Sequence, residues 1–186
     1  MAPERSSRPS SFKKAIEKRK RVPKTNCPFE PKLLIAAPNW PPLLSYPSQE
    51  NWRVVIVPNR FPALTHIERC SEAIASGPYL SRTGVGHHDL VITRDHFKNF
   101  AELSPEHATE VLAVMKKRYE ELAADPCITY ASTFYNWGAK AGASLYHPHY
   151  QILALPIVPP DVQHSLNGSE RYYRKNKKCV HCDMLA

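Results

Sequence analysis

The alternation of apolar and polar side chains predicts four strands along the chain. Residues 52–57 (Trp-Arg-Val-Val-Ile-Val) and 89–93 (Asp-Leu-Val-Ile-Thr) are rich in β-branched side chains, and we expect each of them to form a strand. Two further strands are expected over residues 128–135 and 149–155. Because loops rather than helices connect most of these strands, antiparallel pairing is favoured, and the expected fold class is α+β rather than doubly wound α/β.

One long helix is predicted between the second and third strands. Ser104 is a suitable N-cap, Pro105 fits the first turn, and Asp125-Pro126 ends the segment. The face that packs on the sheet is predicted by apolar residues at helical spacing, namely Ala108, Val111, Leu112, Met115, Tyr119 and Leu122. We therefore expect an antiparallel sheet with one main helix packed on it.

The composition predicts the nature of the loops, the cellular location and the redox state of the cysteines. The chain has 186 residues, 42% of them hydrophobic, and its 18 prolines against 6 glycines predict long, proline-rich loops. No uncharged apolar stretch reaches the length of about 18 residues that spans a membrane, and the N-terminus lacks the apolar core of a secretory signal. We therefore expect a cytoplasmic protein without membrane contact. Its cysteines are expected to be reduced, with Cys70 and Cys127 as core or surface thiols.

Positive charge is concentrated at the N-terminus. Residues 1–26 hold nine Lys or Arg and two Glu, which is +7 of the formal net charge of +8, and a second basic cluster lies within 171–178. Such runs indicate either a phosphate-rich partner or a solvated tail, and both interpretations stay open. Phe12 is the only aromatic residue within the first run, and no nucleic-acid-binding motif is found, so nucleic acid is not the expected partner.

Candidate chemistry lies in residues 136–151 (Asn-Trp-Gly-Ala-Lys-Ala-Gly-Ala-Ser-Leu-Tyr-His-Pro-His-Tyr-Gln). On an extended strand, His149 and Gln151 share one face. An imidazole can attack a phosphoryl group while an amide donates hydrogen bonds to its oxygens. Gly142 and Ser144 would bring backbone amides and a hydroxyl to the same oxygens. The alternative is a buried histidine pair whose nitrogens bond to the backbone, and the neighbouring Gly/Ser run and Gln151 count against it.

Residues 147–151 (His-Pro-His-Tyr-Gln) resemble the His-Pro-His-x-Gln signature of the galactose-1-phosphate uridylyltransferase family, a branch of the histidine-triad superfamily. Other segments match in order. Residues 2–9 resemble an early Arg-x-x-Arg-Pro segment, 57–64 a Val-Pro-Asn-x-Phe-Pro-Ala turn, and 86–92 the family's second strand. The resemblance covers nearly the whole chain and implies a histidine-triad-like antiparallel sheet.

The resemblance implies a role for each matching residue. His149 would be the nucleophile that displaces sugar 1-phosphate from a nucleotide sugar, with UDP-glucose as the expected donor, and a second sugar 1-phosphate would take the nucleotidyl group in a ping-pong reaction. Gln151 and Ser144 would hold the transferred phosphoryl group. Contacts to the substrate are implied for Arg5, Arg8, Asn59, Asn136 and Gly142. A plain basic tail is the alternative for the two arginines, and a turn residue is the alternative for Asn59.

The resemblance also implies a structural metal site. The family holds zinc with a Cys-x-x-Cys turn, a later histidine and the first histidine of His-Pro-His. The matching positions here are Cys27, Glu30, His96 and His147. Carboxylate oxygen is an accepted zinc ligand, and replacing one thiolate by carboxylate makes iron the alternative metal.

Three parts are expected along the chain. Residues 1–26 form a basic segment that contacts the nucleotide in part, and 27–160 form the nucleotidyltransferase domain. Residues 161–186 form a C-terminal tail that opens a second half, absent here, so that the chain corresponds to the N-terminal half of the family. Within this tail, Cys179 and Cys182 make a Cys-x-x-Cys turn and a candidate second metal site. The resemblance also implies a homodimer.

Two other functions stay open. One is a phosphorylase or hydrolase of the same superfamily, including an ADP-sugar phosphorylase or adenylyltransferase. The usual hydrolases carry a third histidine where Gln151 stands, and glutamine cannot act as a general acid, which favours transfer over hydrolysis. The other is a non-catalytic, metal-stabilised fragment that binds a nucleotide, and such a fragment would never become labelled at His149.

Overall fold

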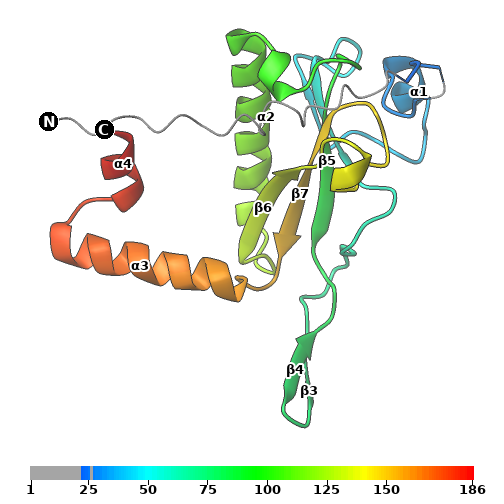
Figure 1. Cartoon of the computed structure of the whole chain (residues 1–186). Helices are drawn as coiled ribbons and strands as arrows, with labels where there is room; N and C mark the ends of the chain where they lie inside the picture. The colour runs from blue at the N-terminus through cyan, green and yellow to red at the C-terminus, as the bar shows by residue number, and fades with distance from the viewer. Residues whose placement is uncertain (1–21, 26) are drawn as a thin grey trace, which may run out of the picture.

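The chain folds around a five-stranded antiparallel sheet with strand order β1-β2-β5-β7-β6 (Figure 1). A computed structural model describes residues 22–25 and 27–186. The strands of the sheet are β1 (Leu44–Tyr46), β2 (Val54–Pro58), β5 (His87–Thr93), β6 (Tyr130–Tyr135) and β7 (His149–Leu155). The four strands expected from the sequence are all present, and β1 is added at one edge. The expected α+β class is confirmed.

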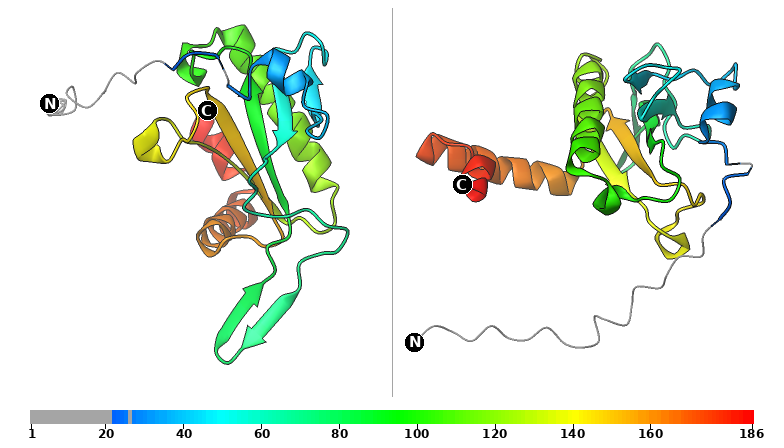
Figure 2. Two further views of the ribbon diagram at one scale, coloured as in Figure 1. Left: turned by 90° about the vertical axis from the view of Figure 1, so that its right-hand side faces the viewer. Right: turned by 90° about the horizontal axis from the view of Figure 1, so that it is seen from above.

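Helix α2 (Pro105–Ala123) lies along one face of the sheet (Figures 1 and 2). As predicted, the Ser104 hydroxyl oxygen caps it by accepting a hydrogen bond from the His107 backbone N–H at 3.3 Å. Its buried side chains pack on the sheet and are Val111, Val114, Met115 and Leu122. Leu112, which was expected on this face, is 56% exposed, and Val114 is buried instead.

The opposite face of the sheet is covered by α1 (Pro31–Ile35) and by the proline-rich loops around it (Figure 2). Successive residues of β2 point to opposite faces. Val54 and Ile56 therefore join the core under α2, whereas Val55 and Val57 join the second core. The other buried members of this second core are Phe29, Leu34, Trp40, Trp52, Leu90 and Ile92. With both faces covered, β2 and β5 are almost fully buried.

Several elements that the sequence did not predict extend from this body. β3 (Ala73–Ser76) and β4 (Tyr79–Arg82) form an exposed hairpin that projects from one end of the sheet (Figure 1). The expected tail, residues 161–186, is mostly helical: it contains α3 (Pro160–Asn176) and α4 (Val180–Leu185), and α3 leads away from the sheet (Figure 2). The described residues also include the short 3-10 helices η2 (Phe100–Glu102) and η3 (Ala139–Ala141). Among the described helices, none has the length and apolar character required to cross a bilayer.

Cys70 and Cys127 form a disulfide, so the expectation that both are thiols is wrong. The two residues are 57 positions apart in sequence, but folding brings their Cα atoms to 4.9 Å. The bond ties the segment before β3 to the turn that follows α2. Their spacing in the sequence contains no sign of this pairing, because the pairing depends on how β5 and α2 fold between them.

Candidate functional site

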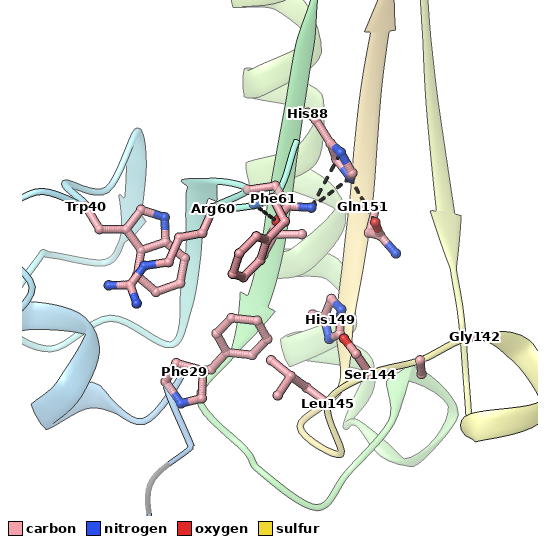
Figure 3. A pocket seen from close by; sticks show the side chains of 14 residues that line it. Phe29, Trp40, Arg60, Phe61, His88, Gly142, Ser144, Leu145, His149 and Gln151 are labelled. Carbon is pink, nitrogen blue, oxygen red and sulfur yellow. Dashed lines mark hydrogen bonds between the residues drawn. The ribbon is translucent and has the colours of Figure 1, made fainter. Parts of the chain in front are cut away.

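A cavity of about 540 Å³ lies on the face of the sheet opposite α2 (Figure 3). Strands β5 and β7 form its floor, and the loops on either side form its walls. Five of the residues that the sequence singled out line it, namely Asn59, Gly142, Ser144, His149 and Gln151. The structure therefore brings the candidate nucleophile and most of its expected partners to one site.

His149 is held in one tautomer by the backbone. Its Nδ1 lies 2.9 Å from the carbonyl oxygen of His147. A carbonyl oxygen can only accept, so Nδ1 carries the proton and the lone pair of the neutral ring is on Nε2. The Phe29 ring packs edge-on against the imidazole at a centroid distance of 5.1 Å. The ring is 8% exposed and lines the cavity. A fixed orientation and an unprotonated Nε2 are what a nucleophilic imidazole requires.

Gln151 is oriented through His88, which the sequence left without a defined role. The Ala63 backbone N–H donates to His88 Nδ1 at 2.9 Å, so His88 Nε2 carries the proton. This Nε2–H donates to Gln151 Oε1 at 2.8 Å. Because Oε1 is engaged in this way, the amide nitrogen of Gln151 points away from His88 (Figure 3). The amide can then donate to an anionic ligand in the cavity.

Asn59 serves both as a turn residue and as part of the cavity wall. Its Oδ1 accepts a hydrogen bond from the Phe61 backbone N–H at 3.0 Å, and its side chain lies against His88. The turn carries Arg60 and Phe61 to the cavity (Figure 3). The Arg60 guanidinium sits 4.2 Å from the centre of the Trp40 ring, a cation–π distance. Sequence reasoning missed Trp40, Arg60 and Phe61, although two of them directly follow Asn59.

The loop between β6 and β7 brings Ser144 to the cavity. Gly138 and Gly142 have φ of +88° and +80°, a backbone region that favours glycine. The Ala143 N–H donates to the Gly138 carbonyl at 3.1 Å and closes the loop just before Ser144. Asn136, at the start of the loop, is absent from the described residues that line the cavity.

A group of four potential metal ligands lies next to the candidate nucleophile. The ligand atoms of Cys27, Glu30, His96 and His147 all lie within 4.8 Å of one another. Glu30 Oε1 lies 2.8 Å from His96 Nδ1 and 3.6 Å from His147 Nδ1, and Cys27 Sγ lies 3.6 Å from His147 Nδ1. Thiolate, carboxylate and two imidazoles make a suitable donor set for zinc.

Backbone carbonyls orient the two histidines of this group through hydrogen bonds from their Nε2 atoms. His147 Nε2 donates to the Thr93 carbonyl at 2.7 Å, and His96 Nε2 donates to the Val22 carbonyl at 3.0 Å. Their Nδ1 atoms therefore face the carboxylate, in the way that backbone carbonyls orient metal-binding histidines. Burial lowers the pKa of His147 to about 4, so its imidazole is neutral and able to coordinate. Burial raises the pKa of the Cys27 thiol, which a bound cation would offset.

Other predicted site residues lie elsewhere. Arg5 and Arg8 fall outside the described residues. Cys179 and Cys182 are exposed on and next to α4. Over residues 22–25 and 27–186 there are two groups of three or more potential metal ligands, and neither includes these two cysteines.

The fold aligns with solved structures of known families. It aligns with an ADP-glucose phosphorylase from Arabidopsis thaliana solved with bound ADP-glucose, at a TM-score of 0.70 and 30% identity over 91% of this chain and 52% of that one. It also aligns with a galt-like protein from Arabidopsis thaliana, at a TM-score of 0.68 and 32% identity over 86% of this chain and 49% of that one. The structural class is that of galt-like α+β proteins.

The chain belongs to the galactose-1-phosphate uridyl transferase family, whose N-terminal domain matches residues 4–159. It is 32% identical over 98% of its length to an ADP-glucose phosphorylase from Arabidopsis thaliana, covering 52% of that protein. It is 26% identical over 73% of its length to a galactose-1-phosphate uridylyltransferase from Thermotoga maritima, covering 43% of that protein. The chain thus spans about half the length of these relatives or less, and the family resemblance seen in the sequence is confirmed.

Proposed function

We propose that the cavity binds a nucleotide sugar and that His149 takes its nucleotidyl group. The Nε2 lone pair of His149 attacks the phosphorus next to the nucleoside and forms an N–P bond. The bond from that phosphorus to the bridging oxygen breaks, and sugar 1-phosphate leaves with the electron pair. The Nδ1 proton stays on the ring, hydrogen-bonded to the His147 carbonyl at 2.9 Å, and this contact is the observation that supports the proposal most directly.

The other cavity residues stabilise the charge that develops on the transferred phosphoryl group. The Gln151 amide on β7 and the Ser144 hydroxyl on the β6–β7 loop are donors that line the same cavity, as does the backbone at Gly142. Arg60 adds a positive charge near the cavity, held over Trp40. We propose that Asn59 contacts the nucleoside of the bound nucleotide sugar. Asn136, Arg5 and Arg8 are proposed as further substrate contacts.

The nucleotide and the acceptor define two versions of this reaction. In the first, the donor is UDP-glucose and the acceptor is a hexose 1-phosphate. In the second, the donor is ADP-glucose and inorganic phosphate resolves the intermediate. The second version is favoured by the ADP-glucose phosphorylase of Arabidopsis thaliana, which matches 98% of this chain. The homodimer that the resemblance implies and the cytoplasmic location expected from the sequence belong to the same proposal.

We further propose that Cys27, Glu30, His96 and His147 hold zinc, with iron as the alternative. The ion would have a structural task, because it would fix the position of His147. The His147 carbonyl in turn accepts the Nδ1 hydrogen bond of His149. The site would therefore support the nucleophile through one residue without touching the substrate.

Intact-mass measurement tests the proposed reaction. The purified chain is incubated separately with UDP-glucose and with ADP-glucose, and its mass is then measured. We expect an added nucleoside monophosphate from one of the two donors, and the added mass identifies the base. The labelled protein is then given inorganic phosphate or galactose 1-phosphate, and the acceptor that removes the label separates phosphorolysis from transfer. Absence of a label with both donors would contradict the proposal.

Replacing His88 by leucine should slow nucleotidyl transfer about 10-fold, because Gln151 loses the hydrogen bond that orients its amide. Replacing Gln151 by alanine should have a similar effect. If His88 acts through Gln151, the double variant should be no slower than either single variant. The measurement is the initial rate of label formation at saturating donor.

A merely structural role for His88 would give a different pattern. In that case the rate losses of the two single variants would multiply in the double variant. The His88→Leu chain would also be less stable in urea unfolding, to a degree that accounts for its lower rate. His107→Leu provides a matched control, because His107 lies on α2, on the opposite face of the sheet from the cavity.

A further inference from the structure

A second group of potential metal ligands lies at the other end of β5 from His96 and His147. It consists of His66, His87 and Asp125, whose ligand atoms all lie within 4.8 Å of one another. The rings of His66 and His87 stack at a centroid distance of 4.1 Å, and His87 Nε2 lies 3.0 Å from Asp125 Oδ2. The sequence assigned no partners to these histidines.

The backbone brings the two imidazoles together. Thr65 forms a parallel bridge with Val85, in which the Thr65 N–H donates to the Gly84 carbonyl at 3.0 Å and the Gly86 N–H donates to the Thr65 carbonyl at 3.1 Å. His66 and His87 directly follow the bonded residues. Gly86 is required at this crossing, because a Cβ there would lie 2.2 Å from the Ala154 carbonyl oxygen. The histidine pair is therefore positioned by backbone hydrogen bonds between the segment before His66 and the segment before His87.

Asp125 is held in place from two sides. Its Oδ1 accepts a hydrogen bond from the Cys127 backbone N–H at 2.9 Å, while Oδ2 faces His87. The disulfide between Cys70 and Cys127 ties this turn to the segment that carries His66. The hydrogen bond from His87, followed by that from the Cys127 amide, lowers the pKa of Asp125, so its carboxylate is ionised at neutral pH.

We propose that His66, His87 and Asp125 bind a divalent transition-metal ion of the zinc class, separately from the Cys27 group. Two imidazole nitrogens and one carboxylate oxygen form a three-ligand set that suits zinc and leaves a coordination position for water or a ligand. The ion would replace the hydrogen bond between His87 and Asp125, and the displaced proton would move to His87 Nδ1. The hydrogen bond between His87 and Asp125 engages two of these groups, and the stacked His66 ring brings a third ligand within reach of the same ion.

The location indicates what the ion would do. His66 and His87 also line a second cavity of about 400 Å³, which shares Asn59 and His88 with the wall of the main cavity. The segment from Asn59 to His66 runs between the two cavities and carries Arg60 and Phe61. An ion bound to His66 would anchor one end of this segment.

Zinc content tests the proposal independently of any enzyme activity. The full chain, His66→Gln, Asp125→Asn and the control His164→Gln are equilibrated in the same zinc-buffered solution, and zinc per chain is measured by atomic emission. His164 is an exposed histidine on α3. We expect His66→Gln and Asp125→Asn to hold one zinc ion fewer per chain than the unmodified chain, and His164→Gln to hold the same number.

Cobalt substitution identifies which site is affected. Cobalt in the Cys27 group would show thiolate charge-transfer absorption, whereas the His66 group contains no sulfur. The charge-transfer band should therefore persist in His66→Gln while its total cobalt falls. If His66→Gln holds as much zinc as the unmodified chain, the proposal is wrong. His66 is exposed, so this variant decides the question even if Asp125→Asn disturbs its turn.

Discussion

Alanine in place of His149 is expected to abolish the nucleotidyl adduct while leaving the chain folded. The substitution removes the attacking nitrogen, and we expect label formation to fall by at least about 1,000-fold. The imidazole lines the cavity, packs against the Phe29 ring and donates a hydrogen bond to the His147 carbonyl, so the loss in free energy of unfolding should be about 2 kcal/mol, less than for the fully buried His147. Intact mass after incubation with the donor measures the first effect, and urea unfolding measures the second.

His164→Ala is the matched control for this experiment, because it removes an exposed imidazole far from the cavity-lining residues in sequence. It should label at the rate of the unmodified chain. If His149→Ala also labelled at that rate, another side chain would be the acceptor of the nucleotidyl group. Mapping the labelled peptide would then identify that side chain.

The His147→Ala change should mainly lower the free energy of unfolding. His147 is fully buried, donates to the Thr93 carbonyl, and contacts the rings of Phe29 and His96. Its removal leaves a cavity and an unpaired carbonyl, and we expect a loss of about 3–5 kcal/mol in the free energy of unfolding. A chelator should lower the stability of the unmodified chain in urea unfolding but should not lower that of His147→Ala further, because the variant has already lost a ligand.

The pH dependence of stability provides a second signature of His147. Its pKa is lowered from 6.5 to about 4 in the folded, metal-free chain. Between these values the unfolded chain binds the extra proton, so stability falls as pH drops from 6.5 to 4, by roughly 3 kcal/mol in total. His147→Ala should lack this slope. If His147→Ala and His149→Ala lost equal stability, the division of roles between the two histidines would be wrong.

Local patterns in the sequence were sufficient for the elements that carry the site. The period of two along β7 places His149 and Gln151 on the same side, and both line the cavity. Ser104 and the apolar spacing that follows it located α2 to within two residues at each end. Such predictions succeed because caps and periodicity depend on neighbouring residues only.

Other features depend on how distant segments meet, and the sequence could not show them. The stacking of His66 on His87 depends on the bridge between Thr65 and Val85, and the disulfide joins Cys70 and Cys127 across the intervening β5 and α2. Helix α3 was missed for another reason. Its sequence is mostly polar and includes Gly168, a poor helix former, so few apolar residues mark it as a helix.

The disulfide closes a covalent ring that contains the β3–β4 hairpin, β5 and α2. The hairpin is exposed, and Tyr79 and Leu80 beside its turn are 76% and 73% exposed, which makes this turn a natural target for proteases of chymotrypsin-like preference. A single cut there would open the ring without releasing a fragment, since the two pieces would stay joined through sulfur. The nicked chain would also keep β5, the strand that pairs with both β2 and β7, and would separate into two peptides only after reduction.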